Sequence, residues 1–386
     1  MARNKKKIIR AATVSLSVDF FKEVMIRMRE AGYEMVALTS PGEDLWKLRD
    51  ENGFDIIEVP MERRMSPFKD LKSLFSLIIA FAKEKPQVVH SMTPKAGLLC
   101  MLAAWLTRVP VRIHTFTGLV WPTSTGLSRK ILMTTDWITC ACATHVVPEG
   151  QGVLDDLRSH ITKKPMKVLG YGNVMGVDME RFDPKRFDIK RNDNDPFTFT
   201  FVGRVVGDKG INELVEAFCK LNKKYPNTKL KLIGGYEREL DPLLPDVDDA
   251  IEHNDAIEAN GPCYGEDLLV EYLKADCHVM PSYREGFPNS VLEAGAMGRP
   301  QIVTDINGSR EIITGLEKTD GNMRICKNGI IVPSKDTDNL YRAMELMLTD
   351  SKMRESMKAE ARPSIMSRFE KGFVQSCLIA FYKEII

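Results

Sequence analysis

Two glutamates, Glu285 and Glu293, stand eight positions apart in a stretch typical of a turn between a strand and a helix. We expect a strand to end near Pro281 and Glu285 to lie on the loop that follows. Pro288 suits the first position of the next helix, because its missing N–H has no partner to lose there. Glu293 then lies about one and a half turns into that helix.

The start of this helix is the expected site for an anion. The first amides of a helix have no partner within it and carry the positive end of its dipole. A phosphate held there would leave Glu293 to bind a vicinal diol such as ribose, and Glu285 to hold hydroxyls of an attached sugar. The residues expected to line the site are Gly286, Phe287, Pro288, Asn289 and Ser290. The alternative is that both glutamates are solvated acids beside an ordinary turn.

A second stretch, residues 202–211, carries the opposite charge. It reads Val-Gly-Arg-Val-Val-Gly-Asp-Lys-Gly-Ile and follows an apolar strand. Gly203 permits close backbone approach. Arg204, through its forked guanidinium, and Lys209, as a point charge, can neutralise a diphosphate. The alternative is a surface loop with two common basic residues, but both stretches follow strands of one domain, and together they indicate a ligand site.

Strand and helix signals alternate along the chain in two series. The first series predicts strands at 7–14, 33–39, 55–59, 87–91, 111–115, 145–147 and 167–169. The second predicts strands at 197–202, 229–233, 256–259, 278–281, 301–304 and 329–332. Because helical segments lie between the strands, each series predicts a parallel sheet with helices on both faces.

An α/β chain of two Rossmann-like, doubly wound domains follows from this alternation. The polar stretch 178–196 is the expected hinge. We expect residues 1–185 and 186–369 to form the two domains, and the last helix, 370–386, to cross back and pack on the first. Ligands of open parallel sheets bind beyond the carboxyl ends of the strands, so the domains are expected to face a central cleft.

Bulk composition narrows the class of protein. At 386 residues the chain suits two domains, and its net charge of +1 gives no general attraction to nucleic acid. The eight cysteines include no C-x-x-C pair, which favours reduced thiols over disulfides or zinc. The apolar runs are shorter than the ~20 residues of a membrane span, and no signal peptide is recognisable, so we expect a cytoplasmic protein.

The charged motifs resemble the signature of glycosyltransferase family 4, whose members have the GT-B fold and retain the anomeric configuration of the transferred sugar. That signature is G-R-x4-K-G followed by E-x7-E, found here from Gly203 to Gly210 and from Glu285 to Glu293. The resemblance implies that Arg204 and Lys209 bind the diphosphate of a nucleotide sugar, with UDP preferred by family frequency. It also implies that Glu285 contacts the transferred sugar and that Glu293 binds the ribose.

The first domain resembles a branch of this family that acts in bacterial capsule, exopolysaccharide or lipid-linked glycan assembly. The resemblance lies in the stretches 90–97 and 111–118. It implies transfer of a hexose or N-acetylhexosamine to a polyprenyl-diphosphate-linked saccharide. His114 matches the position that contacts the donor sugar, the alternative being a buried strand histidine. Lys95, at a helix start, is expected to receive the acceptor's phosphate, unless it is a simple surface lysine.

Two departures from the family pattern affect the acceptor site and the hinge. A Gly-Gly loop is common after the first strand, but this chain has Thr-Val-Ser-Leu-Ser-Val at 13–18. Ser15 or Ser17 is expected to take over the acceptor contact. Met175 replaces the usual Asn before Gly-Val-Asp, and its effect is not predicted.

We expect catalysis to need no metal or other cofactor. Three D-x-D triplets occur, at 193–195, 246–248 and 336–338, but none follows an expected strand with a loop that faces the cleft. The retaining reaction would then be a front-face transfer, in which the leaving phosphate helps to accept the acceptor proton. Arg204 and Lys209 would stabilise the charge that develops on that phosphate.

Peripheral membrane contact is a further hypothesis. It rests on the basic residues 5–7, on Arg63-Arg64-Met65, and on a helix at 68–81 that is rich in Leu, Ile and Phe. The alternative is a core helix beside solvated lysines.

Competing functions are a sugar-nucleotide epimerase of the same fold and a binding protein that has lost catalysis. A dinucleotide oxidoreductase is disfavoured, because no G-x-G-x-x-G follows the first strand.

Overall fold

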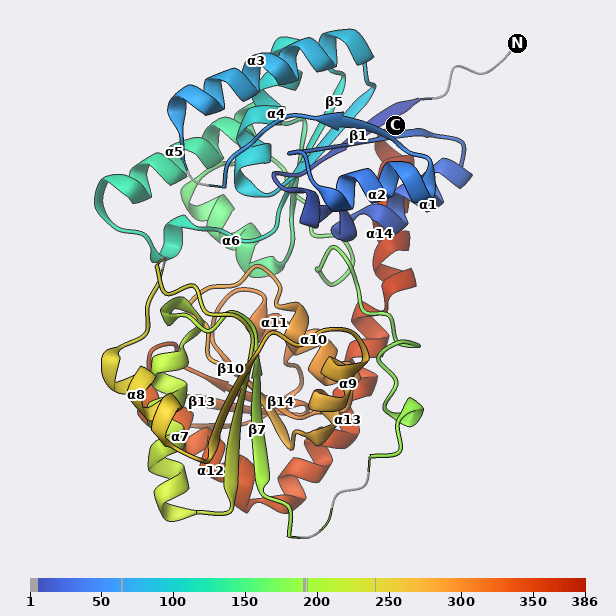
Figure 1. Cartoon of the computed structure of the whole chain (residues 1–386). Coiled ribbons are helices and arrows are strands. Elements are labelled where there is room, and N and C mark those ends of the chain that lie inside the picture. Colours follow the sequence, from blue (N-terminus) through green and yellow to red (C-terminus); the bar gives the residue numbers. More distant parts are fainter. Residues whose placement is uncertain (1–5, 64, 190–191, 193, 240) are drawn as a thin grey trace. The chain divides into compact units, whose positions relative to one another are not determined.

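The computed structural model describes residues 6–63, 65–189, 192, 194–239 and 241–386 (Figure 1). Lys5, Arg64 and Asp193, which entered the membrane and metal hypotheses, lie outside the described residues. The chain divides into two compact units, Met1–Gly176 with Gly372–Ile386, and Val177–Lys371. Each contains an open sheet with mostly parallel strands, so the predicted pair of doubly wound α/β units is confirmed.

The sheet of the first unit is entirely parallel, in the order β3-β2-β1-β4-β5-β6. Its strands are β1 (Lys7–Ala11), β2 (Glu34–Thr39), β3 (Asp55–Glu58), β4 (Val88–Met92), β5 (Val111–Phe116) and β6 (His145–Pro148). The chain moves outward from β1 in one direction and from β4 in the other. The loops after these two strands therefore diverge and leave a crevice at the carboxyl edge of the sheet.

Helices cover both faces of this sheet, because alternate strand residues point to opposite sides. They are α1 (Lys22–Glu30), α2 (Glu43–Asn52), α3 (Pro67–Glu84), α4 (Pro94–Leu106), α5 (Gly126–Cys142), α6 (Gln151–His160) and α14 (Lys371–Ile385). Ile9 packs in a core cluster with side chains of α3 to α6. Its neighbour Ile8 packs in a separate cluster with α1, α2 and α14.

The last helix, α14, is part of the first unit, as predicted. Leu378, Phe381 and Tyr382 belong to the core cluster on one face of the first sheet. The Tyr382 hydroxyl also accepts a hydrogen bond of 2.8 Å from Nη1 of Arg10, a buried residue of β1. A buried guanidinium needs such partners because losing water without them is costly.

The sheet of the second unit has the order β12-β13-β14-β11-β10-β7-β8-β9. Its strands are β7 (Phe197–Val202), β8 (Thr228–Ile233), β9 (Ile257–Gly261), β10 (Cys277–Met280), β11 (Gln301–Thr304), β12 (Leu316–Asp320), β13 (Met323–Cys326) and β14 (Gly329–Val332). The pairings of β12 with β13 and of β13 with β14 are antiparallel, and the other pairings are parallel. The direction of winding reverses between β7 and β10, which is where open sheets of this kind bind ligands.

Seven helices accompany this sheet in the described chain. They are α7 (Ile211–Lys224), α8 (Pro245–His253), α9 (Gly265–Lys274), α10 (Asn289–Ala296), α11 (Ser309–Ile312), α12 (Thr337–Thr349) and α13 (Ser351–Phe369). In α7 the buried residues Leu214, Phe218 and Leu221 recur at spacings of four and three, so one face of the helix packs against the sheet.

One predicted strand is wrong. Residues 167–169 form no ladder, and Met166 makes an isolated bridge to Val146. The antiparallel pair β12 and β13 was not expected from the sequence, and neither were α6, α8, α11 and α13. Within the described residues, no helix has the length and apolar character needed to cross a bilayer.

Candidate active site

Both predicted motifs lie at the carboxyl edge of the second sheet. The stretch 203–210, with a 3-10 turn at Gly207–Lys209, follows β7. The stretch 281–288 follows β10 and leads into α10. Strands β7 and β10 are hydrogen-bonded neighbours, with His278 opposite Thr200. The fold thus brings two loops that are about eighty residues apart in the sequence to one point of the sheet edge.

Close backbone contact fixes these loops against each other. Gly210 has φ 72°, and a Cβ built there would lie 2.1 Å from the carbonyl oxygen of Pro281. The amide of Tyr283 donates to the carbonyl oxygen of Asp208 at 2.9 Å. A side chain at position 210 would push the loops apart, so glycine is required there by both conformation and space.

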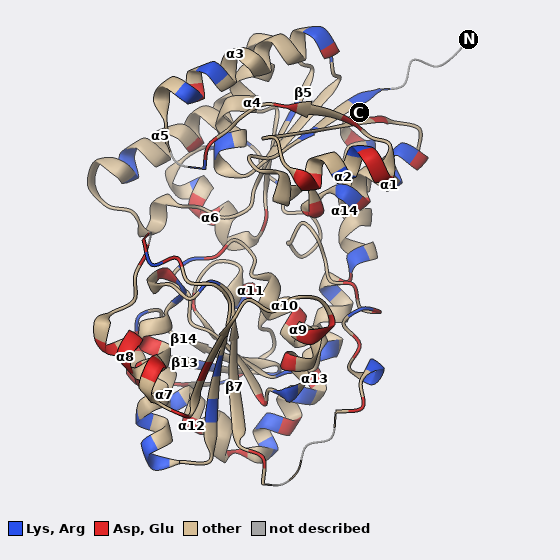
Figure 2. Cartoon of the chain, viewed as in Figure 1, with Lys and Arg blue, Asp and Glu red and all other residues tan. Residues whose placement is uncertain are grey.

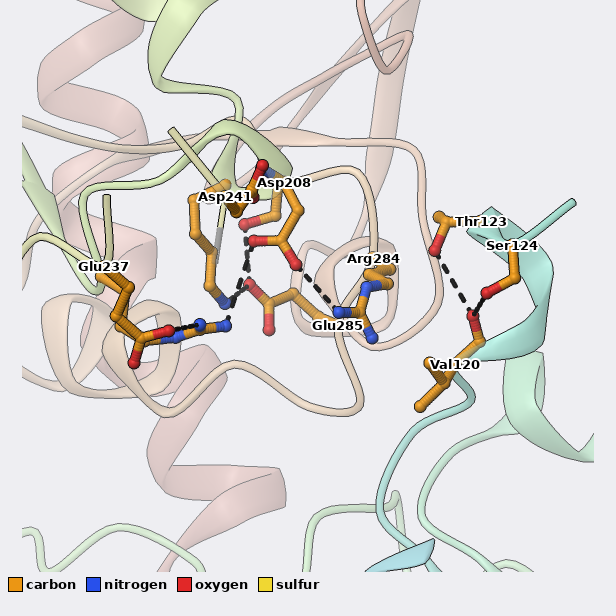
Figure 3. A network of polar contacts seen from close by, with 11 residues as sticks. Val120, Thr123, Ser124, Asp208, Glu237, Asp241, Arg284 and Glu285 are labelled. Carbon is orange, nitrogen blue, oxygen red and sulfur yellow. Dashed lines mark hydrogen bonds and ion pairs between the residues drawn. The ribbon is translucent and has the colours of Figure 1, made fainter. Parts of the chain in front are cut away.

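The cations of the site are paired with acids in the unliganded chain. Lys209 Nζ lies 2.5 Å from Glu285 Oε1, and both side chains are more than four-fifths buried. Arg204 Nη1 lies 2.6 Å from Glu237 Oε2 in a more exposed pair. Figure 3 shows these groups, which come from separate loops, gathered in one network.

Further contacts extend the network. Ser282 Oγ donates to Glu285 Oε1 at 2.7 Å, and Arg284 Nη2 lies 2.9 Å from Asp208 Oδ2 (Figure 3). The amide of Asp208 donates to Asp241 Oδ2 at 2.6 Å. The acids hold the cationic side chains in place and offset their charge, so an incoming diphosphate must compete with them.

The helix start is close to its predicted position, with one correction. Pro288 is the residue before the helix, with φ −70° and ψ 112°, and the first helical residue is Asn289. Pro288 fits there because its carbonyl accepts the first helical hydrogen bond, from the amide of Val291 at 3.2 Å. Over the described residues, the amides of Phe287 and Ser290 have no hydrogen-bond acceptor. Two unpaired donors therefore lie at the positive end of α10.

Glu293 lies on α10 and is partly exposed. Its Oε2 accepts a hydrogen bond of 3.0 Å from the hydroxyl of Tyr272, which is fully buried. Burial raises the pKa of Glu293 to about 7, while the Tyr272 hydrogen bond and the charge of Arg181 act in the opposite direction. Near neutral pH this carboxyl group is therefore close to its titration point.

In the first unit, His114 lies on β5 and is 1% exposed. Its Nδ1 is 2.8 Å from Ser91 Oγ, and its ring stands edge-on to Phe116. Burial lowers the pKa of His114 to about 3, so the imidazole is neutral. The side chain lines a small pocket with Asp136, whose pKa burial raises to about 7. His114 can thus offer a hydrogen bond to a ligand, but it cannot offer a positive charge.

The expected acceptor residues lie near the carboxyl edge of the first sheet. Lys95, in the first turn of α4, forms an ion pair of 2.6 Å with Asp70 of α3, and its side chain is 11% exposed. It is therefore not a simple surface lysine. Ser15 is partly exposed and donates to Asp44 Oδ2 at 3.3 Å. Ser17, the second serine considered, lines a large cavity together with Lys95.

Where the structure describes them, the D-x-D triplets at 246–248 and 336–338 lie in helices or at a helix start. Asp246 and Asp248 are on α8, and Asp336 caps α12 by accepting a hydrogen bond from the amide of Asn339. Within the described ranges, no three His, Cys, Asp or Glu side chains are arranged to hold a metal ion.

Several site residues were not found from the sequence. Glu237 follows β8, Arg284 lies between the two motif glutamates, and Tyr272 is on α9. The position of Glu237 just beyond a strand and a Gly-Gly pair was a usable signal. Tyr272 gave none, because an aromatic residue in an amphipathic helix is usually a core residue.

Comparisons with known proteins agree with this geometry. Residues 182–363 match the family of glycosyl transferases group 1, and residues 20–172 match the glycosyl transferase 4-like domain. A capsular polysaccharide biosynthesis glycosyltransferase, CapM of Staphylococcus aureus, is 30% identical over 99% of this chain and 98% of its own length.

Two further similarities extend the comparison. An Escherichia coli UDP-Gal:alpha-D-GlcNAc-diphosphoundecaprenol alpha-1,3-galactosyltransferase is 29% identical over 80% of this chain and 78% of its own. The crystal structure of HepE from Anabaena in complex with UDP has a TM-score of 0.74, with 13% identity, over 98% of this chain and 100% of that one. The fold, the motif geometry and the near full-length relative agree, and the chain belongs to the group 1 glycosyltransferases with a family 4-like amino-terminal domain.

Proposed function

We propose that this glycosyltransferase moves a hexose or N-acetylhexosamine from a nucleotide sugar, preferably UDP-linked, to a polyprenyl-diphosphate-linked saccharide in bacterial surface polysaccharide synthesis. The observation that carries the proposal is the cluster at the β7/β10 edge. There, the pair of Lys209 and Glu285 lies beside the start of α10, and Glu293 follows on that helix.

The donor fits this cluster group by group. Its diphosphate would replace the carboxylates that pair with Arg204 and Lys209. It would also accept hydrogen bonds from the unpaired amides at the start of α10. Glu285, released from Lys209, would accept hydrogen bonds from the sugar hydroxyls. Glu293 would accept two from the ribose, which requires its ionised form.

The chemistry proposed is front-face transfer with retention of configuration. The acceptor hydroxyl attacks the anomeric carbon on the face that the diphosphate leaves, and its proton passes to the departing phosphate oxygen. Lys209 and Arg204 stabilise the charge that builds up on that phosphate. In this scheme the two cations take over the task of a metal ion, and no metal or other cofactor is needed.

Relatives support the acceptor and the nucleotide. The Escherichia coli relative uses UDP-galactose and acts on a diphosphoundecaprenol-linked sugar, and the Staphylococcus aureus relative acts in capsule biosynthesis. The HepE structure contains UDP. An epimerase and an inactive binding protein are not favoured, because these relatives transfer sugars and the motif residues are intact.

Peripheral membrane association is part of the proposal. The face of α3 opposite its buried residues Ser73, Leu77 and Phe81 carries a row of exposed apolar side chains. That row consists of Phe68 at 91% exposure, Leu71 at 52%, Phe75 at 58% and Ile79 at 68%. The outer face of a helix in a soluble protein is usually polar. This exposed apolar row therefore indicates a surface that is covered when the protein binds a partner or a membrane.

Neighbouring helices add to this apolar surface. Helix α4 packs against both α3 and α5. The exposed apolar residues of α4 and α5 are Trp105, Leu106, Leu127, Ile131 and Trp137. Figure 2 shows basic residues on α3 and α5. In the sequence, Lys69 and Lys72 lie on α3, and Arg129 and Lys130 lie on α5. Aromatic and aliphatic side chains flanked by cations are the composition that binds anionic bilayers.

A donor panel tests the core of the proposal. The protein is heated with UDP-glucose, UDP-galactose, UDP-N-acetylglucosamine, UDP-N-acetylgalactosamine and GDP-mannose in turn, and one of the UDP-sugars is expected to raise its melting temperature. That donor is then incubated with undecaprenyl-diphosphate-linked N-acetylglucosamine, and the product is analysed by mass spectrometry and NMR. Stabilisation by GDP-mannose instead would refute the UDP preference, and a product of inverted anomeric configuration would refute the mechanism. Conversion of the donor to its epimer would establish the competing function.

A further inference from the structure

A large cavity belongs to the first unit, whereas the two donor motifs belong to the second. Its volume is about 480 Å³, within the range of about 300–1,000 Å³ typical of small-molecule sites. It is lined chiefly by apolar side chains, among them Val14, Met65, Leu98, Leu99, Val120 and Leu132. It lies where the loops after β1 and β4 diverge, at the ligand-binding edge of the first sheet.

The lining is apolar on the inside and cationic at the rim. Leu99 is 4% exposed, so it lies on the floor, whereas Met65 is 60% exposed and lies at the opening. Arg63 lines the cavity and is also exposed, and in the described part of the chain it has no ion-pair partner. Asp70 lines the wall, but its charge is offset by Lys95 at 2.6 Å.

Such a lining selects an amphiphile. An apolar chain would gain from burial against the leucines, in proportion to the area it removes from water. A phosphate attached to that chain would stay at the rim, where Arg63 can bind two of its oxygens. Thr13, Ser17 and Thr135 also line the cavity, but most of its wall surface is apolar. A sugar or a nucleotide would therefore bury most of its hydroxyls against apolar groups, which is unfavourable.

The opening lies beside the exposed apolar row of α3. Pro67 and Met65 line the cavity, and Phe68, the most exposed large apolar residue of that row, follows directly in the sequence. A chain that leaves the cavity at Met65 could therefore continue along an apolar surface.

We propose that this cavity binds the phosphate-proximal isoprenoid units of the lipid acceptor, with Arg63 as a ligand of the phosphate. The proposal rests on the proposed function, since it presumes a lipid-linked acceptor. It gives the chain a specificity for the lipid in addition to the sugar. It also revises the expected role of Lys95, which positions the cavity wall through Asp70, while the phosphate contact falls to Arg63.

Binding of a short probe tests this directly, without donor or transfer. The probe is farnesyl phosphate below its micellar concentration, titrated calorimetrically into the full chain, with farnesol and inorganic pyrophosphate as separate arms. Saturating UDP is present in every arm, so that no phosphate can bind at the donor site. Farnesyl phosphate is expected to bind at least tenfold more tightly than either. Equal affinity for farnesol would overturn the role of Arg63, and equal affinity for pyrophosphate would overturn the role of the cavity.

Substitutions locate the probe. Leu98→Trp fills the cavity and is expected to lower the affinity for farnesyl phosphate more than tenfold. Leu132→Gln keeps the side chain near its original size and is expected to lower that affinity severalfold. Leu127→Trp is the matched control, because Leu127 is exposed on the same helix as Leu132 and does not line the cavity. Arg63→Gln is expected to lower the affinity for farnesyl phosphate and to leave the affinity for farnesol unchanged. If Leu98→Trp and Leu127→Trp bind the probe equally, the cavity is not the site.

Two readouts separate this proposal from the proposed function. Stabilisation by the nucleotide sugar reports on the second unit, so it should be the same in every cavity variant. Circular dichroism and the melting temperature of the unliganded chain show that the first unit of each variant is folded. Transfer to a lipid-linked saccharide, with probe binding insensitive to Leu98→Trp, would remove the cavity proposal alone. Probe binding as expected, with no transfer to any lipid-linked saccharide, would remove the proposed function alone.

Discussion

At the scale of single residues, the donor site is a set of charges that neutralise one another until a ligand replaces some of them. Lys209 and Glu285 form a mostly buried pair, so each holds the other in place, and removing one would leave the other buried without a partner. Arg204 and Glu237 form a more exposed pair, which contributes little to stability. The first pair is therefore the one whose disruption should be felt in both folding and catalysis.

Lys209→Ala removes the cation closest to the sugar-binding glutamate. We expect kcat/KM to fall by a factor equivalent to about 2–4 kcal/mol, the loss typical for one donor that stabilises developing charge. Lys220→Ala is the control, because Lys220 also pairs with an acid, Asp338 at 2.9 Å, but on the exposed surface of α7. Steady-state kinetics with the identified donor measure both. Turnover of Lys209→Ala at the wild-type rate would remove the assigned role.

Glu293 predicts a pH dependence of donor binding. Its pKa is raised to about 7, and the ribose contact needs the carboxylate, so donor affinity should fall as the pH is lowered through about 7. Tyr272 donates to this carboxylate, and Tyr272→Phe removes a bond worth about 1.5–3 kcal/mol, which shifts the midpoint upward by about one pH unit or more. Calorimetric titration of UDP between pH 5.5 and about 9 measures the midpoint. An unchanged midpoint in Tyr272→Phe would show that the hydrogen bond does not tune Glu293.

The same shift affects stability, with the opposite direction in pH. Because the pKa of Glu293 is higher in the folded chain than its ordinary value of 4.5, the folded state holds a proton that the unfolded state has lost between those two values. The contribution of Glu293 to the free energy of unfolding therefore decreases as the pH rises through that window. We expect the effect of Glu293→Gln on the free energy of unfolding of the unliganded protein, measured by urea unfolding, to be more stabilising at pH 8 than at pH 4.5. The same substitution should lower the affinity for UDP. A pH-independent effect would contradict this account.

At the scale of elements, the two motif loops depend on glycines for their close contact. Gly210→Ala places a Cβ against the Pro281 carbonyl at a φ of 72°, so we expect a loss of stability and of UDP affinity. Gly298→Ala is the matched control, since Gly298 has the same φ of 72° but nothing within 4 Å of the added Cβ. The control should lose about 1–2 kcal/mol of stability from backbone strain and keep its UDP affinity. Equal losses of UDP affinity would show that contact between the loops does not shape the site.

The elements that the sequence predicts well are those that are buried on both sides. Strands such as β7 and β11 are nearly continuous apolar or β-branched runs, which is how parallel strands read. Strand β12 could not be found in this way, because most of its side chains are exposed and it pairs at the sheet edge. Helix α13 contains Pro363, which normally argues against a helix. The motif residues were found from spacing. Glu237 had a usable signal in its position after a strand and a Gly-Gly pair, whereas Tyr272 reaches the site through a tertiary contact that spacing does not encode.

At the scale of the whole molecule, the chain passes twice between its two units, after Gly176 and after Lys371. Apart from His114 on β5, the expected donor residues lie in the second unit, and the expected acceptor residues lie in the first. A substitution in one unit can therefore be checked through the ligand of the other, since distant sites without shared contacts behave nearly independently. The two sets of residues belong to different compact units, and the sheet of each unit has its own ligand-binding edge.

The apolar row of α3 supplies the last prediction, because it concerns where the molecule works. Phe68→Glu combined with Phe75→Glu removes two exposed aromatic side chains, each worth about 1.5–3 kcal/mol when buried, and adds two negative charges. We expect sedimentation with vesicles of phosphatidylcholine and phosphatidylglycerol to fall at least tenfold. Binding of the wild type should weaken as salt is added, because its flanking lysines are attracted to the anionic lipid.

The matched control for that row places the same charges on exposed apolar residues of the second unit. Leu316→Glu with Met366→Glu meets this requirement, since both residues are well exposed and lie on β12 and α13. If the two double variants sediment equally, vesicle binding does not depend on α3, and if the wild type does not sediment, the peripheral association itself is wrong. UDP should stabilise both variants as it does the wild type, because neither pair touches the β7/β10 edge. A loss of transfer to a lipid-embedded acceptor, with transfer to a detergent-dispersed one retained, would then place the role of α3 in reaching the membrane rather than in the chemistry.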